Sequence, residues 1–185
     1  MTKLLIKYND AYICEKYRNE LDFINIPMYY PNNKAFSNLS IFITLFSTGL
    51  LSQDYSSERK LIEEEVAKLI FKHGIEKKCV VTSFDWENIL RMRQAAPELE
   101  TGYLTGVVDE TTLLKMQAVG CVELCPEATL VTPDRVREWH EKGFRVRAWG
   151  IKDESLMRCV YDSGADGMTV NFPDKLTAYM GKTER

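Results

Sequence analysis

The chain of 185 residues is 45% hydrophobic and 28% charged, and it carries a formal net charge of −3. It is long enough for one domain with a sizeable core, and its composition is ordinary for a soluble globular protein. No basic stripe points to a nucleic-acid partner, and so small a charge neither favours nor excludes an anionic substrate.

The first 56 residues, rich in Tyr, Asn and Phe, carry one clear pattern. Residues 1–35 are assigned no structure, whereas apolar residues alternate through Leu39–Phe46, which is typical of a strand. The apolar run from Ile41 to Leu51 is far shorter than the roughly 20 residues that span a bilayer. No small-residue cleavage site follows the start of the chain. We therefore expect neither a membrane span nor a signal peptide.

From residue 57 onward, helical and strand patterns alternate. Apolar residues recur at helical spacing between cap residues and glycines or prolines in residues 57–73, 86–95, 111–118, 133–142 and 154–163. Short apolar or alternating runs predict strands over residues 79–84, 101–105, 122–125, 144–149 and 166–170. Successive strands start about twenty-two residues apart, the length of one strand, one helix and two short loops. This repeat predicts a parallel sheet, open or closed into a barrel.

In such an architecture, sites gather where strands end and helices begin. The polar and aromatic residues at those places are Thr82, Ser83, Phe84, Asp85, Thr105, Glu123, Cys125, Glu127, Trp149, Lys152, Asp153, Thr169 and Asn171.

Two residues after the strand at 79–84 allow more than one role. Ser83 is a possible nucleophile, but no histidine is placed to activate it and no Gly-x-Ser-x-Gly elbow is present. A loop or helix-cap hydroxyl is the favoured interpretation. Asp85 is a possible acid or metal ligand, but we favour it as the cap of the helix that follows. Thr132, before Pro133, and Asp153 are expected to cap later helices.

The carboxylate of Glu123 stands inside an apolar strand, between Val122 and Leu124. Such a group needs a partner or a polar cavity if it is buried. A solvent-facing position is equally consistent with the sequence. Trp149 is either a wall for an organic substrate group or an ordinary core residue, and the same two interpretations apply to Phe84 and Phe172.

The two histidines, His73 and His140, each precede a helix-ending glycine, where a cation interacts well with a helix C-terminus. That end of the helix faces away from the expected site, so we predict no catalytic role for either. After residue 57 the sequence shows no ligand cluster with metal spacing and no phosphate-binding glycine loop.

The five cysteines, Cys14, Cys79, Cys121, Cys125 and Cys159, are scattered along the chain. Four residues of strand separate Cys121 and Cys125 by roughly 13 Å, too far for a disulfide. We predict free, buried thiols in a reducing cytoplasm.

Several segments together resemble one family. Residues 80–93 (VVTSFDWENILRMR), 96–104, 130–133, 139–143, 146–153 (VRAWGIKD) and 164–174 (GADGMTVNFPD) look like the second half of glycerophosphodiester phosphodiesterases. The resemblance covers about residues 57–178. It implies a (β/α)₈ barrel that hydrolyses glycerophosphodiesters to glycerol 3-phosphate and an alcohol, a reaction of lipid metabolism. Family members use a divalent metal such as calcium or magnesium, held by carboxylates, and two histidines for proton transfer.

The chain departs from that pattern at the catalytic groups. The family's His-Arg-Gly, Glu-x-Asp and second histidine have no counterpart, and Thr44 and Phe46 stand where a metal carboxylate and a lysine are expected. The resemblance therefore implies no catalytic or metal-binding residue here. It leaves a substrate-binding wall of Ser83, Phe84, Trp149 and Glu123.

We therefore predict an α/β fold, a partial (β/α)₈ TIM-type barrel with five or six parallel strands. Residues 1–50 form an N-terminal segment and residues 51–185 the C-terminal part of the barrel. The predicted function is phosphodiester hydrolysis, weak or absent in this chain alone. A non-catalytic binding module and a small α/β protein of unrelated activity are the alternatives. Exposed strand edges predict weak stability or self-association.

Overall fold

A computed structural model describes residues 4–7, 28–29, 41–45 and 56–183, with side chains from 63 to 181. The strands are β1 (Leu4–Lys7), β2 (Met28–Tyr29), β3 (Ile41–Leu45), β4 (Cys79–Ser83), β5 (Glu100–Thr105), β6 (Glu123–Pro126), β7 (Arg145–Ala148) and β8 (Gly167–Thr169). The α-helices are α2 (Ser56–Lys72), α3 (Trp86–Ala95), α4 (Glu110–Ala118), α5 (Pro133–Glu141), α6 (Glu154–Asp162) and α7 (Pro173–Thr183). Two short 3₁₀ helices cover Glu76–Lys78 and Ala128–Leu130.

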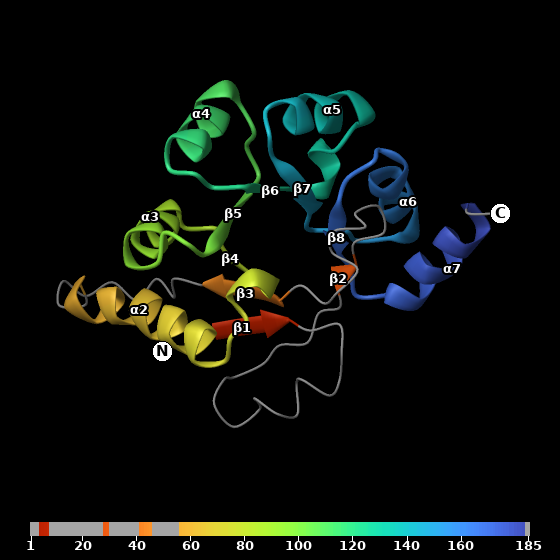
Figure 1. The fold of residues 1–185 in the computed structure, drawn as a ribbon. Helices are drawn as coiled ribbons and strands as arrows, with labels where there is room; N and C mark the ends of the chain where they lie inside the picture. The colour runs from red at the N-terminus through yellow and green to blue at the C-terminus, as the bar shows by residue number, and fades with distance from the viewer. Residues whose placement is uncertain (1–3, 8–27, 30–40, 46–55, 184–185) are drawn as a thin grey trace.

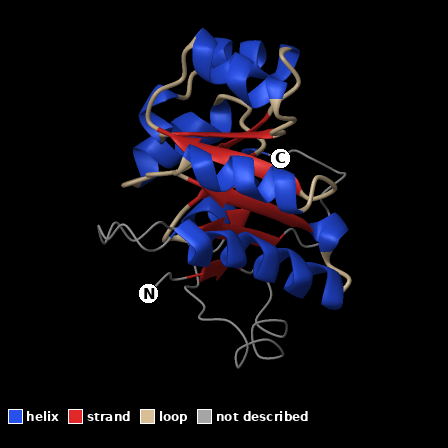
Figure 2. Cartoon of the chain, turned by 90° about the vertical axis from the view of Figure 1, so that its left-hand side faces the viewer, coloured by secondary structure: helices blue, strands red, loops and turns tan. Residues whose placement is uncertain are grey.

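The strands form one sheet in the order β1-β3-β4-β5-β6-β7-β8-β2. The six central strands, β3 to β8, are parallel, and β1 and β2 pair antiparallel at the two edges. The sheet curls, and α3, α4, α5 and α6 follow in an arc on its convex side (Figure 1). Figure 2 shows helices (blue) packed against the strands (red) of the sheet. The predicted partial barrel with five or six parallel strands is confirmed.

The N-terminal strands belong to this sheet. β3 confirms the centre of the strand predicted at Leu39–Phe46, and its two predicted ends lie outside the described residues. β1 pairs with β3, and β2 pairs with Met168 and Thr169 of β8. Both edges of the parallel sheet therefore carry a strand from the first 35 residues, for which the sequence predicted no structure.

Four helices begin at a polar residue whose side chain accepts a hydrogen bond from a backbone amide of the first turn: Asp85, Asp109, Thr132 and Asp153. Each such bond satisfies an amide that has no partner within the helix. The caps predicted at Asp85, Thr132 and Asp153 are confirmed, whereas α7 was not predicted. Gly143 and Gly164 follow α5 and α6 with φ of +88° and +80°, a conformation that glycine adopts without strain.

The core lies between the convex face of the sheet and the helices. Leu124, Val146 and Met168, on three neighbouring strands, are at most 1% exposed and pack with Met116 and Trp139 of the helices. Burying each large apolar side chain stabilises the fold by about 1.5–3 kcal/mol. Because side chains alternate along a strand, the residues between these apolar positions face the concave side.

The described cysteines are free thiols, as the sequence predicts, but not all of them are buried. Cys79, Cys121, Cys125 and Cys159 are free, and all but Cys159 are buried. Cys14 lies outside the described residues. Within the part of the chain that the structure describes, no helix is long and apolar enough to cross a membrane.

Candidate functional site

The carboxyl ends of β4, β5, β6 and β7 meet at one edge of the sheet. Ser83 pairs with Tyr103, Thr105 with Pro126, and Glu127 with Trp149, so the register continues one residue beyond β6 and β7. Side chains that are far apart in the sequence are brought together here. This edge is where parallel β/α architectures carry their sites.

An aromatic pair crosses this edge. The rings of Phe84 and Trp149 have centroids 4.9 Å apart and planes at 87°, an edge-to-face contact. Phe84 is 43% exposed and Trp149 is half-buried, so neither is an ordinary core residue. Phe172, in contrast, packs against the core. The fold thus brings two of the predicted wall residues into contact.

Trp149 is fixed in place by β6. Its indole Nε1 donates a hydrogen bond to the carbonyl oxygen of Cys125 over 3.0 Å. Its backbone N–H donates to Pro126, and its carbonyl accepts from Ala128 over 2.8 Å. These bonds hold the indole across the end of the neighbouring strand. Trp149 is therefore the fixed member of the aromatic pair.

The hydroxyl of Ser83 is fully buried and points toward α3. It accepts hydrogen bonds from the backbone N–H of Asp85 over 3.0 Å and from Nδ2 of Asn88 over 3.1 Å. This is the loop and cap role that the sequence favoured over a nucleophile. In this position Ser83 fixes the turn that carries Phe84.

Other strand-end polar residues also hold loops and helix starts. Oγ1 of Thr105 accepts from the amide of Val107 and donates to its carbonyl. Asp85 and Asp153 accept from amides in the first turns of α3 and α6. These groups stabilise the edge of the site.

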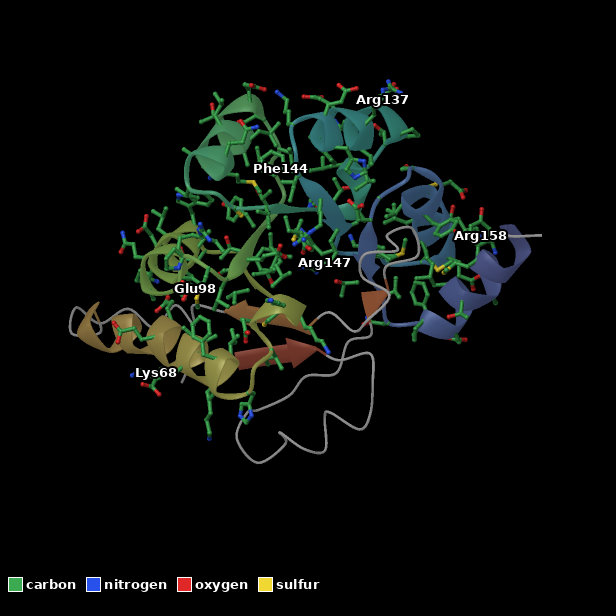
Figure 3. The ribbon with its side chains drawn as sticks, viewed as in Figure 1. Lys68, Glu98, Arg137, Phe144, Arg147 and Arg158 are labelled. Carbon is green, nitrogen blue, oxygen red and sulfur yellow. The ribbon has the colours of Figure 1, made fainter. Side chains whose placement is uncertain are left out.

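Glu123 is buried on the concave side and paired, so the solvent-facing alternative is wrong. Its Oε1 accepts from Nε of Arg147 over 2.7 Å, and both residues are 1% exposed. Arg145 reaches the other oxygen, with its Nε at 3.8 Å. Figure 3 shows Arg147 within the curve of the sheet, whereas Arg137 and Arg158 lie on the outer helices. Sequence analysis missed this partner.

Arg147 joins a wider buried network. Its other nitrogens donate to the hydroxyl of Thr169 and to the sulfur of Cys125, each over 3.2 Å. Burial raises the pKa of the Cys125 thiol well above its ordinary value, so the thiol stays protonated and donates to Glu123. The signal in the sequence was the alternation of Arg145, Val146 and Arg147, which puts both arginines on the face of Glu123.

Glu127 is one of the residues that the sequence places at a strand end. It pairs with Trp149, and its side chain lies between Gly106 and Gly150. A methyl group on Gly106 would lie 3.8 Å from Oε2 of Glu127, and one on Gly150 would lie 3.6 Å from its Cγ. The carboxylate of Glu127 therefore lies beside the indole of Trp149, and the two glycines on either side of it contribute only backbone atoms.

Both histidines lie at the opposite edge, as the sequence predicted. His73 follows the last turn of α2, which leads into the start of β4. Nε2 of His140 lies 2.8 Å from Oδ2 of Asp166, which also accepts from the amide of Val146 over 2.7 Å. His140 thus ties α5 to the amino ends of β7 and β8.

The described residues do not fit the divalent metal that the resemblance implies. Among them, no three His, Cys, Asp or Glu side chains converge. The oxygens of Glu123 are held by guanidinium groups. Thr44, expected at a metal-carboxylate position, pairs in register with Thr82, and Phe46 lies outside the described residues. No chemical step is therefore assigned to a metal.

Comparisons with known proteins point to one family. The model of the glycerophosphoryl diester phosphodiesterase family matches residues 35–175. A glycerophosphodiester phosphodiesterase of Caldanaerobacter subterraneus subsp. tengcongensis is 25% identical over 118 residues, which cover 62% of this chain and 47% of the relative. One of Bacillus subtilis is 26% identical over 125 residues, 63% of this chain and 42% of the relative. The chain spans about half the length of the curated relatives it matches.

Solved structures show the same fold. A Parabacteroides distasonis glycerophosphodiester phosphodiesterase superposes with a TM-score of 0.63 and 18% identity, over 72% of this chain and 56% of the other. A Silicibacter pomeroyi protein assigned to the same activity gives 0.64 and 24%, over 69% and 46%. With the family model matched over more than half of its length, this chain belongs to the glycerophosphoryl diester phosphodiesterase family.

Proposed function

We propose that this chain contributes the substrate-facing wall of a glycerophosphodiester-binding site. The observation that carries the proposal is the contact of Phe84 with Trp149 at the carboxyl edge of the sheet. The names of the curated relatives support the substrate class. Hydrolysis of such a substrate breaks a phosphorus–oxygen bond, giving glycerol 3-phosphate and an alcohol, and belongs to lipid metabolism. In this proposal Ser83 positions Phe84, and Glu123 shapes the concave face through Arg147.

We propose further that this chain alone hydrolyses glycerophosphodiesters weakly or not at all. Loss of the alcohol from a phosphodiester is accelerated by a group that donates a proton to the leaving oxygen, most often a histidine. The sequence holds two histidines, and His73 and His140 lie at the amino ends of the strands. Neither reaches a ligand held by Phe84 and Trp149 at the opposite edge.

The test measures turnover and binding on the same preparation. The chain is incubated with glycerophosphocholine and calcium or magnesium, and again with EDTA, and glycerol 3-phosphate is followed by an enzyme-coupled assay. We expect no release above the buffer rate, together with binding seen by calorimetry. Metal-dependent turnover would overturn the proposed lack of activity. The absence of both turnover and binding would overturn the substrate wall.

A matched pair of variants locates the binding. Phe84→Leu removes an exposed ring at the site, and Phe71→Leu removes one of similar exposure, 40% against 43%, from α2. We expect Phe84→Leu to weaken diester binding and Phe71→Leu to leave it unchanged. Equal effects of the two substitutions would count against the aromatic wall.

The second candidate is a non-catalytic binding module derived from the same fold. It is favoured by the same placement of His73 and His140, since binding needs no proton transfer. Binding without turnover under every metal condition is expected for the module and equally for the weakly active or inactive chain proposed above. Turnover with either metal would exclude the module and show that this chain alone is an active hydrolase.

We also propose a boundary near residue 50 between an N-terminal segment, which adds β1, β2 and β3 to the edges of the sheet, and the β/α units that follow. A cytoplasmic location and weak self-association are proposed as well. Among the described residues β2 pairs with Met168 and Thr169 of β8, and so short an edge strand supports pairing of this edge with a second copy. Sedimentation velocity at several concentrations checks this. A sharp monomer peak at every concentration, with cooperative unfolding at about 60 °C, would contradict weak self-association.

A further inference from the structure

We propose that Glu63 of α2 and Arg91 of α3 are positioning residues of the candidate site. Through Asn88 they hold residues 83–85, the turn that carries Phe84 at the carboxyl edge of the sheet. The inference rests on the proposed function, because this turn supplies half of the proposed substrate wall. It goes beyond that function by assigning a role at the site to side chains of the outer helices.

An ion pair joins α2 to α3, which lie side by side (Figure 1). Nε of Arg91 donates to Oε1 of Glu63 over 3.0 Å, and the two side chains are 21% and 4% exposed. Oε2 of Glu63 is buried without a hydrogen-bond partner in the part of the chain that the structure describes. Apolar side chains of similar size often hold two elements together as well as such a pair does, or better. The ion pair therefore adds something other than helix packing, namely a guanidinium fixed in place.

The guanidinium of Arg91 orients the side-chain amide of Asn88. A second nitrogen of Arg91 donates to Oδ1 of Asn88, three residues earlier in α3. A guanidinium is a donor only, so it selects the orientation of the amide in which Oδ1 faces Arg91 and Nδ2 is left for another acceptor. Asn88 is buried, so few water molecules compete for this contact.

Asn88 in this orientation fixes the turn. Its Nδ2 donates to Oγ of Ser83 over 3.1 Å, and the same oxygen accepts from the backbone N–H of Asp85 over 3.0 Å. Ser83 is the last residue of β4 and Asp85 caps α3, so these bonds hold the backbone on both sides of Phe84. A continuous series of hydrogen bonds thus runs from α2 to the carboxyl edge. Order present in the turn before a ligand arrives lowers the entropic cost of binding.

The test breaks this series of hydrogen bonds at two places. Asn88→Ala removes its middle and leaves the ion pair intact. Glu63→Leu with Arg91→Met replaces the ion pair by apolar side chains, which keep the two helices packed. Glu63→Gln keeps an oxygen acceptor for Arg91 and should behave as the wild type does. Glu65→Gln with Lys68→Met removes an exposed ion pair of α2 and is the matched control. Circular dichroism checks the folding of each variant.

The first measurement needs no ligand. In the whole chain labelled with 5-fluorotryptophan, the fluorine NMR signal of Trp149 reports the position of the Phe84 ring, because the two ring centroids are 4.9 Å apart. Trp149→Phe assigns that signal. We expect it to shift or broaden in Asn88→Ala and in the apolar double variant, while the signal of Trp139, a core residue of α5, stays unchanged. Glu63→Gln and the matched control should leave both signals unchanged. An unchanged Trp149 signal in both broken variants would overturn the proposal.

The second measurement is the binding of glycerophosphocholine by calorimetry. Each broken variant should bind it about tenfold more weakly than the wild type does. Asn88→Ala combined with the apolar double variant should lose no more affinity than either alone, because both act through one series of bonds. Additive losses, or wild-type affinity together with a shifted Trp149 signal, would overturn the positioning role. If the wild type does not bind the diester, the proposed function is overturned, and the fluorine signals alone decide whether Glu63 and Arg91 hold the turn.

Discussion

Arg147 and Glu123 form an ion pair that is closed off from solvent on the concave side of the sheet. Nε of Arg147 donates to Oε1 of Glu123 over 2.7 Å, and the two side chains are 2% and 1% exposed. Removing two charges from water is costly, and removing only one of them afterwards leaves the other buried without compensation. Replacing one partner of this pair should therefore destabilise the fold more than replacing both.

Arg147→Met should lower the free energy of unfolding by about 3–5 kcal/mol, because it leaves the carboxylate of Glu123 buried. The double substitution Glu123→Gln with Arg147→Met should cost less than Arg147→Met alone. Arg137→Met, which breaks an exposed pair with Asp134, should change the value by about 1 kcal/mol at most. Urea unfolding measures all three, and a double variant less stable than the single one would refute the prediction.

Gly102→Ala should destabilise the fold by about 1–3 kcal/mol, because the new methyl group overfills the concave face. It would lie 3.0 Å from Cγ2 of Thr82 and 3.1 Å from Cβ of Glu123. Gly181→Ala, in α7, meets no atom within 4 Å and should stabilise the helix by about 0.5–1 kcal/mol. Thermal or urea unfolding gives both values, and equal shifts for the two variants would contradict this account.

Stability should fall as the pH rises above about 9. Burial raises the pKa of Cys121 to about 11 and moves those of Cys79 and Cys125 upward as well. The unfolded thiols ionise near pH 8.5 while the folded ones stay protonated, so each contributes a loss of about 1.4 kcal/mol per pH unit. This loss continues until the pH passes the folded pKa.

Urea unfolding between pH 8 and 10.5, under reducing conditions, measures this slope. Cys79→Ala should make it shallower, and Cys159→Ala, which changes an exposed thiol, should not. An identical slope in the wild type and Cys79→Ala would rule out the buried thiols as the cause.

Asp85→Ala should cost about 0.5–2 kcal/mol of stability, since the side chain accepts the amide hydrogen of Glu87 over 3.0 Å. It should also weaken ligand binding, because the same turn carries Phe84. Asp85→Asn keeps an acceptor at the cap and should restore both properties. A variant with full stability but altered binding would assign Asp85 to ligand contact instead.

The regular part of the fold could be predicted because local signals agree with it. The cap at Asp85 and the alternating run before Trp149 gave α3 and β7 close to their observed bounds. β1 and β2 could not be predicted, since short antiparallel edge strands depend on partners far away in the sequence. α7 carries a start signal in Pro173 and Asp174 that sequence analysis did not use.

The candidate site was predicted in part. The sequence placed Phe84 and Trp149 at the same edge, because strand ends of a parallel sheet meet there, but their contact depends on the curl of the sheet. The sequence left open whether Glu123 is buried or faces solvent, because a carboxylate inside an apolar strand has no local signal for its partner. Arg147 lies 24 residues away, and only the register of β6 and β7 connects them.

The pairing of β2 with β8 has a consequence for the order of folding. Met28 and Thr169 are about 140 positions apart, so their strands meet only after all the β/α units between them have been synthesised. The β/α units between them can form from contacts close in sequence. Contacts this distant slow folding, because the entropy of closing the loop must be overcome before the pairing is gained. β2 thus docks at this edge of the sheet long after it has itself been synthesised.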